Sequence, residues 1–392
     1  MATKAQAAPG GATQVVRIPI TNVYMDGDYT GVINVGSQQQ PVNVILDTGS
    51  STLALDGTSY NPSGDGNAQI TDIAQEVQYG SGAWVGAVVR TDISIGTGGQ
   101  AIDLKQVNTA VAYVESRDMF GKSNGILGLA YTRLNNAFVM PGPTWPAKYT
   151  YNQIQQGRST FLNPYFTQLE AGGMVANKFA FYTKRSLVSH ATANPASDPV
   201  NQGYLILGGG EESTDLYTGS FQSINVLDDD WYNTNLRAVI VGNSAPIEVP
   251  PPTKASKQLT NSIVDSGTNS LTLDEQLFTE VTNRLSKGQD RELTHAMRSG
   301  YLKTSSLNLA SWPPITFVMQ GDAGDIRLTV TPENYWQTDA PEKGYASAVI
   351  FSDNGQLNGQ SILGLPLLNG YFTIFDRSVD QGLGAIKFAQ RK

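Results

Sequence analysis

The sequence predicts an all-β protein made of two related lobes, and three observations lead to this prediction. The 392 residues exceed what one hydrophobic core usually holds, so two packed units are expected. Forty glycines, nineteen prolines and seventeen tyrosines favour short strands joined by tight turns over long helices. A weak internal duplication then assigns one repeat to each lobe.

The duplication consists of two apolar residues followed by Asp-(Thr/Ser)-Gly and, later in the chain, by Ile-Leu-Gly. The four motifs are residues 45–49, 126–128, 263–267 and 362–364. One such Asp motif arises by chance in roughly one chain in fifty at average composition, so a single copy would mean little. Two copies with matched partners in the same order are far less common. Each half therefore supplies one carboxylate, Asp47 in the first and Asp265 in the second.

The lobes can be placed along the chain by composition. Residues 1–14 are small and polar with too little apolar surface to offset the entropy of ordering them, so a disordered tail is expected there. The first lobe, with the first Asp motif, is expected over residues 15–205, and the second lobe over 206–392. Helical spacing of apolar residues predicts helices over 274–285 and 163–169, both outside the sheets.

Charge and composition exclude several classes of partner. A net charge of −8 and an acidic pI oppose binding to nucleic acid. The chain has no cysteine, which excludes disulfides and thiolate catalysis and favours a reducing compartment. No run approaches the roughly eighteen apolar residues of a membrane span, and the N-terminus lacks a signal-peptide core. A cytoplasmic location is expected, or a periplasmic or secreted one if a leader has been removed.

Two carboxyl groups that meet would suit peptide hydrolysis. The reaction activates a water while the carbonyl oxygen and the leaving nitrogen gain protons, so one group must accept a proton and another must donate one. Two carboxyls at hydrogen-bonding distance cannot both ionise cheaply, and they can therefore work as an acid and a base together. A single Asp-Gly turn is more often a simple Asx turn, but the symmetric pair favours a catalytic role for Asp47 and Asp265.

The residues beside each Asp fit this chemistry. Thr48 and Ser266 are small enough for close approach, and with Ser50 they are the candidate supports of the two carboxylates. Ser50 and Thr268 offer hydroxyls to the outer carboxylate oxygens. Gly49, Gly267 and Thr268 are candidate substrate-binding residues, because the glycines expose backbone amides. The two turns are expected to act together as one catalytic site in which the two carboxyls share a proton.

These motifs resemble those of the pepsin family of aspartic peptidases. The resemblance rests on residues 47–51, 79–82, 125–131, 207–209, 217–220, 265–268 and 371–377. Together they cover the chain from about Tyr24 to Phe388. The lack of cysteine and of a visible propeptide makes the chain most similar to the cysteine-free bacterial pepsin homologues.

The resemblance implies a bilobal pepsin-like acid protease fold, with an extended peptide in a central cleft under a hairpin flap. The flap would centre on residues 79–82, where Tyr79, Gly80 and Ser81 would contact the substrate. Gly80 and Gly82 permit a tight, mobile tip. On sequence alone an ordinary glycine-rich hairpin fits as well, but the position after the first Asp motif favours the flap.

The chain departs from the family pattern at a few positions. Ala54 stands where many relatives have a Trp that supports the flap tyrosine, so either Trp84 takes that role or the flap is looser. Asn124 and Leu365 stand where relatives often have Asp. None of these changes removes a catalytic group. The aromatic pair at 231–232 resembles one near the primed subsites, although a core role fits at least as well.

Other motifs lack the context they need. Residues 121–125 match both a serine-hydrolase elbow and part of a phosphate loop, but the loop would need glycine at Ser116, and the elbow would need a buried strand where 115–118 is charged. The glycines at 96–99 are better explained by a hairpin turn than by a dinucleotide site. The two histidines lie far apart in the sequence, so no metal site and no cofactor is predicted.

The sequence thus predicts an aspartic endopeptidase that uses Asp47 and Asp265 at acidic pH, prefers bulky hydrophobic residues around the scissile bond, is inhibited by pepstatin and acts as a monomer on peptides or unfolded proteins. Two alternatives stay open at this point. One is a catalytically silent protein of the same fold that binds peptides or inhibits another enzyme. The other is a two-carboxylate glycosidase, which needs its carboxyls at least about 5 Å apart.

Overall fold

The computed structural model describes residues 13–25, 27–80, 82–116, 119–190, 192–252, 260–340, 342–357 and 359–392, without the side chain of Ser299. These residues are mostly β-strand and fall into two compact units. Unit 1 comprises the described residues of Met1–Ile18, Thr30–Phe179 and Leu205–Gly210, and unit 2 those of Pro19–Tyr29, Ala180–Tyr204 and Glu211–Lys392. The units interleave along the chain, and the predicted single division at residue 205 stays a prediction.

The predicted disordered tail lies almost entirely outside the described residues, which begin at Thr13. At its last residue the structure differs from the prediction. The backbone N–H of Gln14 donates to the carbonyl of Met174 at 2.9 Å, and Gln14 forms a parallel bridge with Val175. The side chains of the tail offer too little apolar surface to order it, but this backbone hydrogen bond holds the chain in place at Gln14.

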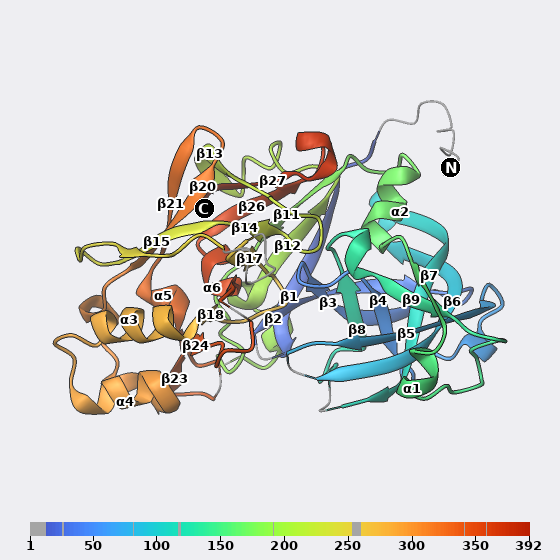
Figure 1. The fold of residues 1–392 in the computed structure, drawn as a ribbon, viewed down its shortest axis with the longest axis horizontal. Coiled ribbons are helices and arrows are strands. Elements are labelled where there is room, and N and C mark those ends of the chain that lie inside the picture. Colours follow the sequence, from blue (N-terminus) through green and yellow to red (C-terminus); the bar gives the residue numbers. More distant parts are fainter. Residues whose placement is uncertain are drawn as a thin grey trace. The chain divides into compact units, whose positions relative to one another are not determined.

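Unit 1 is built from antiparallel and parallel strands with two short helices (Figure 1). Its elements are β2 (Asp28–Val35), β3 (Gln40–Asp47), β4 (Leu53–Asp56), β5 (Gln69–Gln78), β6 (Ala83–Ile95), β7 (Ile102–Glu115), β8 (Gly125–Gly128), β9 (Asn136–Val139), β10 (Arg158–Phe161), α1 (Tyr151–Ile154) and α2 (Tyr165–Ala171). Hydrogen bonding links them in the order β10-β9-β5-β6-β7-β4-β8-β3-β2. Four strands, β1 (Val16–Met25), β2, β11 (Lys178–Tyr182) and β12 (Gln202–Leu207), have residues in both units.

A further pairing closes part of this sheet into a barrel. β2 pairs with β6 through Ile33 opposite Ile95, so that β2, β3, β8, β4, β7 and β6 follow one another in a ring. Closure leaves no free edges along the ring, which protects these strands from pairing with other chains. The interior is apolar, since Val44, Leu46 and Val88 are fully buried.

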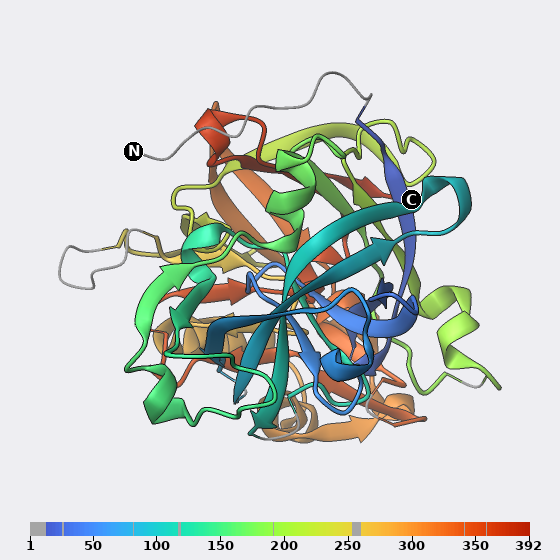
Figure 2. The same cartoon turned by 90° about the vertical axis from the view of Figure 1, so that its right-hand side faces the viewer.

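The two longest strands of unit 1, β6 and β7, form a hairpin that can be followed in cyan in Figure 2. Its register shifts at Val85/Gly86 and again at Thr91/Ile93, which bends the ribbon. At the first shift a side chain on Gly86 would meet the Val111 backbone at less than 3.0 Å. The bend therefore depends on a residue without a Cβ atom.

Unit 2 contains the remaining strands and the longer helices. Its elements are β13 (Tyr217–Asn225), β14 (Asn233–Thr234), β15 (Leu236–Val241), β16 (Ile247–Glu248), β17 (Ser262–Val264), β18 (Leu271–Leu273), α3 (Glu275–Leu285), α4 (Arg291–Ser299), β19 (Tyr301–Lys303), β20 (Ile315–Gly321), β21 (Gly324–Val330), α5 (Pro332–Tyr335), β22 (Trp336–Thr338), β23 (Tyr345–Ala348), β24 (Ile350–Ser352), β25 (Ser361–Leu363), α6 (Leu365–Leu368), β26 (Tyr371–Asp376) and β27 (Ala385–Arg391). They form sheets of order β14-β17-β25-β18-β24, β16-β15-β20-β21 and β19-β23-β22, and a ribbon β26-β27-β13.

Both predicted helices are present. α3 begins after Asp274, whose carboxylate accepts the N–H of Gln276 at 3.1 Å, and it buries Leu277, Val281 and Leu285 on one face. The shorter prediction corresponds to α2. In the described part of the chain, no helix is long and apolar enough to cross a membrane. Most of the regular structure in the described residues is β-strand, which confirms the predicted all-β fold class.

Candidate active site

Asp47 is the last residue of β3, at a point where the strand turns sharply. Its side chain is almost fully buried, at 7% exposure. The N–H of Gly49 donates to Oδ1 at 2.7 Å, and the hydroxyl of Ser50 donates to Oδ2 at 2.5 Å. Hydrogen bonds from its own turn offset the cost of removing this carboxylate from water.

Asp265 follows β17 and is held in the same way. It is also 7% exposed. The N–H of Gly267 donates to Oδ1 at 2.9 Å, and the hydroxyl of Thr268 donates to Oδ2 at 2.6 Å. In each unit the hydroxyl named in the sequence analysis, that of Ser50 or Thr268, thus lies on the carboxylate of its own turn, and the role of these hydroxyls in supporting a working dyad stays a prediction. The amides of Gly49 and Gly267 bind the Asp of their own turn, and their role in substrate binding stays a prediction.

The strands that carry the two turns have the same topology. In unit 1, β3 runs parallel to β8 with Leu46 opposite Leu127, and β4 pairs antiparallel with the other edge of β8. In unit 2, β17 runs parallel to β25 with Val264 opposite Leu363, and β18 pairs antiparallel with β25. The chain thus leaves β3 or β17, turns at the Asp motif and returns on the far side of the Ile-Leu-Gly strand.

This topology explains why Ile-Leu-Gly accompanies each Asp motif. The Ile and Leu fill the strand between the two arms of the turn, and the Gly lies directly beneath the segment that follows the Asp. A Cβ atom on Gly128 would come within 3.0 Å of the backbone of Ser51 and Thr52. One on Gly364 would come equally close to the carbonyls of Thr268 and Ser270. The duplicated glycine is therefore a steric requirement of each turn.

Beneath the first turn lies a buried polar network that the sequence analysis did not find. The hydroxyl of Thr52 donates to Oδ1 of Asn135 at 2.8 Å, and Nε2 of Gln75 donates to the same oxygen at 2.8 Å. All three side chains are buried. The network joins β5 to the segment after Asp47. Its members are 23 to 83 residues apart in the chain, and no motif connects them.

The predicted flap is the turn between β5 and β6. Gln78 pairs with Ala83, and the N–H of Tyr79 donates to the carbonyl of Gly82 at 2.7 Å, which closes a tight turn. Ser81 lies outside the described residues. A Cβ on Gly80 would meet nothing within 4 Å, whereas one on Gly82 would clash with Ser116. One side of the tip is therefore open, while the other packs closely on the end of β7.

Tyr79 lies close to the first carboxylate. Its pKa is raised, first by burial of the hydroxyl and then by the negative charge of Asp47, while the polar groups of Trp84 and Ser50 oppose the shift. Trp84 is fully buried close to Tyr79, and its role in supporting the flap tyrosine stays a prediction. In the described residues neither the Tyr79 hydroxyl nor the indole N–H of Trp84 makes a hydrogen bond of normal distance and angle, although the polar groups of Trp84 and Ser50 lie close enough to Tyr79 to favour its ionised form.

Unit 2 has a pocket of about 440 Å³ that begins two residues after Gly267. Its lining includes Asn269, Met297, Arg298, Tyr301 and Phe351. Tyr301 is 67% exposed and Phe351 49%, which is unusual for aromatic rings unless they face a binding surface. Arg298 is oriented by a hydrogen bond of 2.5 Å to Oδ1 of Asn283. Sequence reasoning missed this pocket because its walls come from separate stretches of the chain, at 269, 296–301, 337–340 and 347–351.

The positions that depart from the family pattern are structural. Asn124 bonds to the backbone N–H of Asn43 through Oδ1 at 3.0 Å and to the Ser59 hydroxyl through Nδ2 at 3.0 Å. Leu365 is buried at the start of α6. Tyr232 lies in the core and accepts a hydrogen bond from Nε of Arg377 at 2.8 Å, which fits the core role considered for that aromatic pair.

Neither histidine lies in a described group of potential metal ligands. Nδ1 of His190 lies 3.2 Å from the Asp198 carboxylate, and His295 lies on α4. The described residues do contain one close acidic group, in which ligand atoms of residues 228–230 lie within 4.8 Å of one another. Acidic groups of this kind are common at protein surfaces without a bound ion.

Comparison with known proteins agrees with these local geometries. A family model described as eukaryotic aspartyl protease matches residues 28–390. Cathepsin D of Chionodraco hamatus is 25% identical over 94% of this chain and 82% of its own length. Pepsin B of Canis lupus familiaris is 27% identical over 93% and 82%, and a beta-secretase of Strongylocentrotus purpuratus is 24% identical over 88% and 64%. The resemblance to the pepsin family and the bilobal all-β fold class are thereby confirmed.

Alanine at either duplicated glycine should destabilise its unit. Gly128→Ala and Gly364→Ala each force a methyl group against backbone atoms that cannot move away cheaply, so each should cost about 2 kcal/mol or more of unfolding free energy. Gly99→Ala and Gly300→Ala are matched controls, because a Cβ at either site meets nothing within 4 Å. Urea unfolding measures the difference, and equal stability of the Gly128 and Gly99 variants would contradict the steric argument.

The flap residues should respond differently to truncation. Tyr79→Phe should leave the melting temperature within about 2 °C of wild type, since the hydroxyl that it removes has no partner. Trp84→Ala leaves a large cavity in the core and should lower the melting temperature by about 10 °C. Differential scanning calorimetry measures both. A large loss for Tyr79→Phe would mean that the hydroxyl makes a bond that this geometry lacks.

Proposed function

This chain belongs to the eukaryotic aspartyl protease family, and on that premise we propose that it is an acid-active aspartic endopeptidase whose Asp47 and Asp265 together activate a water molecule. The observation that carries the proposal is the matched environment of the two carboxylates. Each is 7% exposed, and each receives a backbone N–H on Oδ1 and a hydroxyl on Oδ2 from its own turn.

In the proposed reaction one of the two carboxyls is protonated and the other is ionised. The ionised group takes a proton from water as the water oxygen attacks the carbonyl carbon, and the protonated group donates its proton to the carbonyl oxygen. In the second step the carboxyl that took the water proton donates it to the peptide nitrogen, and the other carboxylate takes a proton from a hydroxyl of the tetrahedral intermediate. The C–N bond breaks, a carboxylic acid and an amine are released, and the pair again holds one proton. The pepsin dyad is the general example of two such coupled carboxyls, which titrate as a pair.

The turn hydrogen bonds give each carboxylate a fixed orientation during these steps. Because Ser50 and Thr268 donate to Oδ2 and the glycine amides donate to Oδ1, neither side chain can rotate without losing a bond. Preorganised groups of this kind avoid the cost of reorganising solvent as charge moves. Thr48 and Ser266, each next to its carboxylate in the chain, are both fully buried.

Tyr79 and the unit 2 pocket support a preference for bulky apolar residues. The ring of Tyr79 lies next to the Asp47 turn and would form one wall beside the scissile bond. The pocket that starts at Asn269 offers Met297, Tyr301 and Phe351 as apolar walls. We propose that Gly80 and Ser81 of the flap pair with the backbone of an extended peptide, as β-strand addition does elsewhere.

The alternative within this family is a catalytically silent peptide-binding or inhibitor protein. Such a protein would not need two carboxylates with matched hydrogen-bond donors, and both sets are intact here. The glycosidase alternative finds no support in the family match. The enzyme is therefore the better proposal.

Amide substitutions of the two carboxylates test the proposed reaction directly. Asp47→Asn and Asp265→Asn should each lower kcat for an unfolded protein substrate at pH 4 by at least about 10³-fold, because either change removes the shared proton. Asp72→Asn, an exposed carboxylate on β5, is the matched control and should keep full activity. Wild-type cleavage should fall between pH 4 and pH 7 and should stop with pepstatin. Activity that survives in Asp265→Asn would eliminate the dyad mechanism.

Truncation of the pocket aromatic tests the specificity proposal. Tyr301→Ala should raise KM by about tenfold for peptides with a bulky apolar side chain, since the lost contact is worth on the order of 1.5 kcal/mol. Peptides with alanine at the same position should be unaffected. A uniform change in KM for both peptides would show that this pocket does not select the substrate.

We also propose that the protein acts as a cytoplasmic monomer and that it is related to the cysteine-free bacterial pepsin homologues. The absence of cysteine from the whole sequence supports the location and the relationship, and the monomer is an expectation from the family resemblance alone. Light scattering of the purified chain measures the oligomeric state, and fractionation of the native host measures the location.

A further inference from the structure

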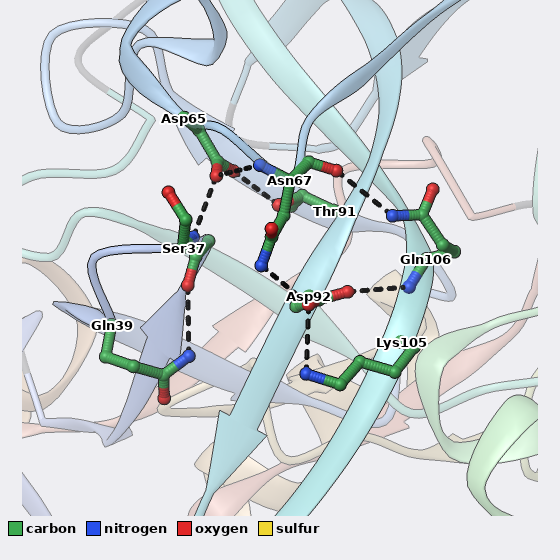
Figure 3. Close-up of polar contacts among 9 residues, drawn as sticks. Ser37, Gln39, Asp65, Asn67, Thr91, Asp92, Lys105 and Gln106 are labelled. Carbon is green, nitrogen blue, oxygen red and sulfur yellow. Dashed lines mark hydrogen bonds and ion pairs between the residues drawn. The ribbon is translucent and has the colours of Figure 1, made fainter.

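A second well-ordered carboxylate of unit 1 lies outside the Asp47 turn, between the short 3₁₀ segment Pro62–Gly64 and β5 (Figure 3). Asp65 receives four hydrogen bonds. The N–H groups of Ser37 and Asn67 donate to Oδ1 at 2.8 and 2.9 Å, and the hydroxyls of Tyr60 and Thr91 donate to Oδ2 at 2.6 and 2.5 Å. Both oxygens are therefore saturated by donors.

The four partners together favour the ionised form. The N–H groups of Ser37 and Asn67 can only donate, so protonation of Asp65 weakens both of these bonds. A proton on Oδ2 would also require the hydroxyl of Tyr60 or Thr91 to turn and accept, which gives up one of the two bonds now donated to that oxygen. Tyr60 stays a donor over the whole acid and neutral range, because burial, the bond to Asp65 and the charge of Asp65 raise its pKa.

The backbone is fitted closely around this carboxylate. Gly36 has a φ of 73°, and a Cβ there would come within 3.0 Å of the Asp65 carboxylate. Its N–H donates to the carbonyl of Asp92 at 2.8 Å, and the N–H of Gly66 donates to the Ser37 hydroxyl at 2.9 Å. The turn between β2 and β3 thus rests directly on Asp65.

The network continues through Asn67 to a second carboxylate (Figure 3). Nδ2 of Asn67 donates to Oδ2 of Asp92 at 2.8 Å, and Nζ of Lys105 and the N–H of Gln106 also donate to Asp92, at 3.0 and 3.2 Å. The titratable groups that face Asp65 are therefore Tyr60 from its own segment and, one residue further, Asp92 on β6 with Lys105 on β7. Among the described residues, Asp65 is held by hydrogen bonds alone and no cationic side chain bonds to it directly.

We propose that Asp65 is an acid-resistant clamp, an ionised carboxylate that keeps the β2–β3 turn fastened to β6 at the pH where the carboxylate-based reaction would work. The fastened turn leads straight into β3, the strand that ends at Asp47. The clamp does not depend on the proposed reaction, since its partners and its test concern the fold of unit 1 alone.

The direction of the pH dependence follows from the hydrogen bonds. Burial raises the pKa of Asp65, but the bonds from Thr91, Tyr60, Ser37 and Asn67 outweigh burial and hold the pKa well below its usual range. A lowered folded-state pKa stabilises the protein fully above the unfolded-state value of about 3.9. That stabilisation declines as the pH falls below about 4, because the unfolded chain then gains the proton first. The native clamp itself remains ionised through that decline.

Carbon-13 NMR of the side-chain carboxyls of the full-length chain tests the ionisation. The Asp65 signal, assigned by its loss in Asp65→Asn, should keep the chemical shift of an ionised carboxylate from pH 6 down to pH 3. A midpoint near that of model peptides, about 3.9, would overturn the proposal. Tyr60→Phe removes one donor and should move the midpoint upward. No movement in that variant would also count against the clamp.

Hydrogen exchange measured by mass spectrometry tests whether Asp65 holds the β2–β3 turn in place. In Asp65→Asn, peptides that cover residues 34–42 and 58–68 should exchange at least tenfold faster than wild type at pH 6, with little change in unit 2. The melting temperature of unit 1 should fall by about 5 °C at pH 6. The difference from wild type should shrink between pH 4 and pH 2. Asp72→Asn is the control, and a difference that stays constant with pH would show that the charge of Asp65 is irrelevant.

Discussion

The structure depends above all on keeping a carboxyl group in a turn that is almost fully buried. Removing an ion from water is costly unless donors replace the lost solvent. At Asp47 the turn itself provides them, through the amide two residues on and the hydroxyl three residues on. The turn can be this tight only if the strand beneath it has no side chain at Gly128, and the same condition holds for Asp265 and Gly364. Apolar burial on the neighbouring strands then fixes the position of the turn in each unit.

Unit 1 combines a rigid frame with a tip that is less constrained. The ring of strands closed by the β2–β6 pairing leaves few ways for β3 to move, and the Thr52, Gln75 and Asn135 network fastens β5 to the segment after Asp47. Beyond Gln78 the constraint weakens, because Gly80 meets no neighbour on its open side. The Tyr79 hydroxyl next to Trp84 is buried without a bond, so it can take a new partner at little cost. Gly80 is therefore packed less closely than the strands that carry it.

The parts of the fold that could be predicted from the sequence are those in which cause and effect lie within a few residues. The Asp motifs, the hydroxyls at positions 50 and 268 and helix α3 with its Asp274 cap all belong to this class. The Gln75 network and the pocket behind Tyr301 could not be predicted, since their members come from segments far apart in the chain. Ser81 of the predicted flap lies outside the described residues. Polar side chains on strands usually face solvent, so Gln75 gave no signal that it points inward.

Asp47 and Asp65 show two opposite uses of the same functional group within one unit. The hydrogen bonds described for Asp47 come from residues two and three positions further along its own turn, so these donors move together with the carboxylate. Asp65 also has local donors in Tyr60 and Asn67, but Ser37 and Thr91 lie 28 and 26 residues away, and movement between these segments would break a bond to the carboxylate. A carboxylate whose described donors all lie in its own turn has less influence on segments elsewhere in the unit. A carboxylate with distant donors couples its charge to the fold itself, which a fastener requires.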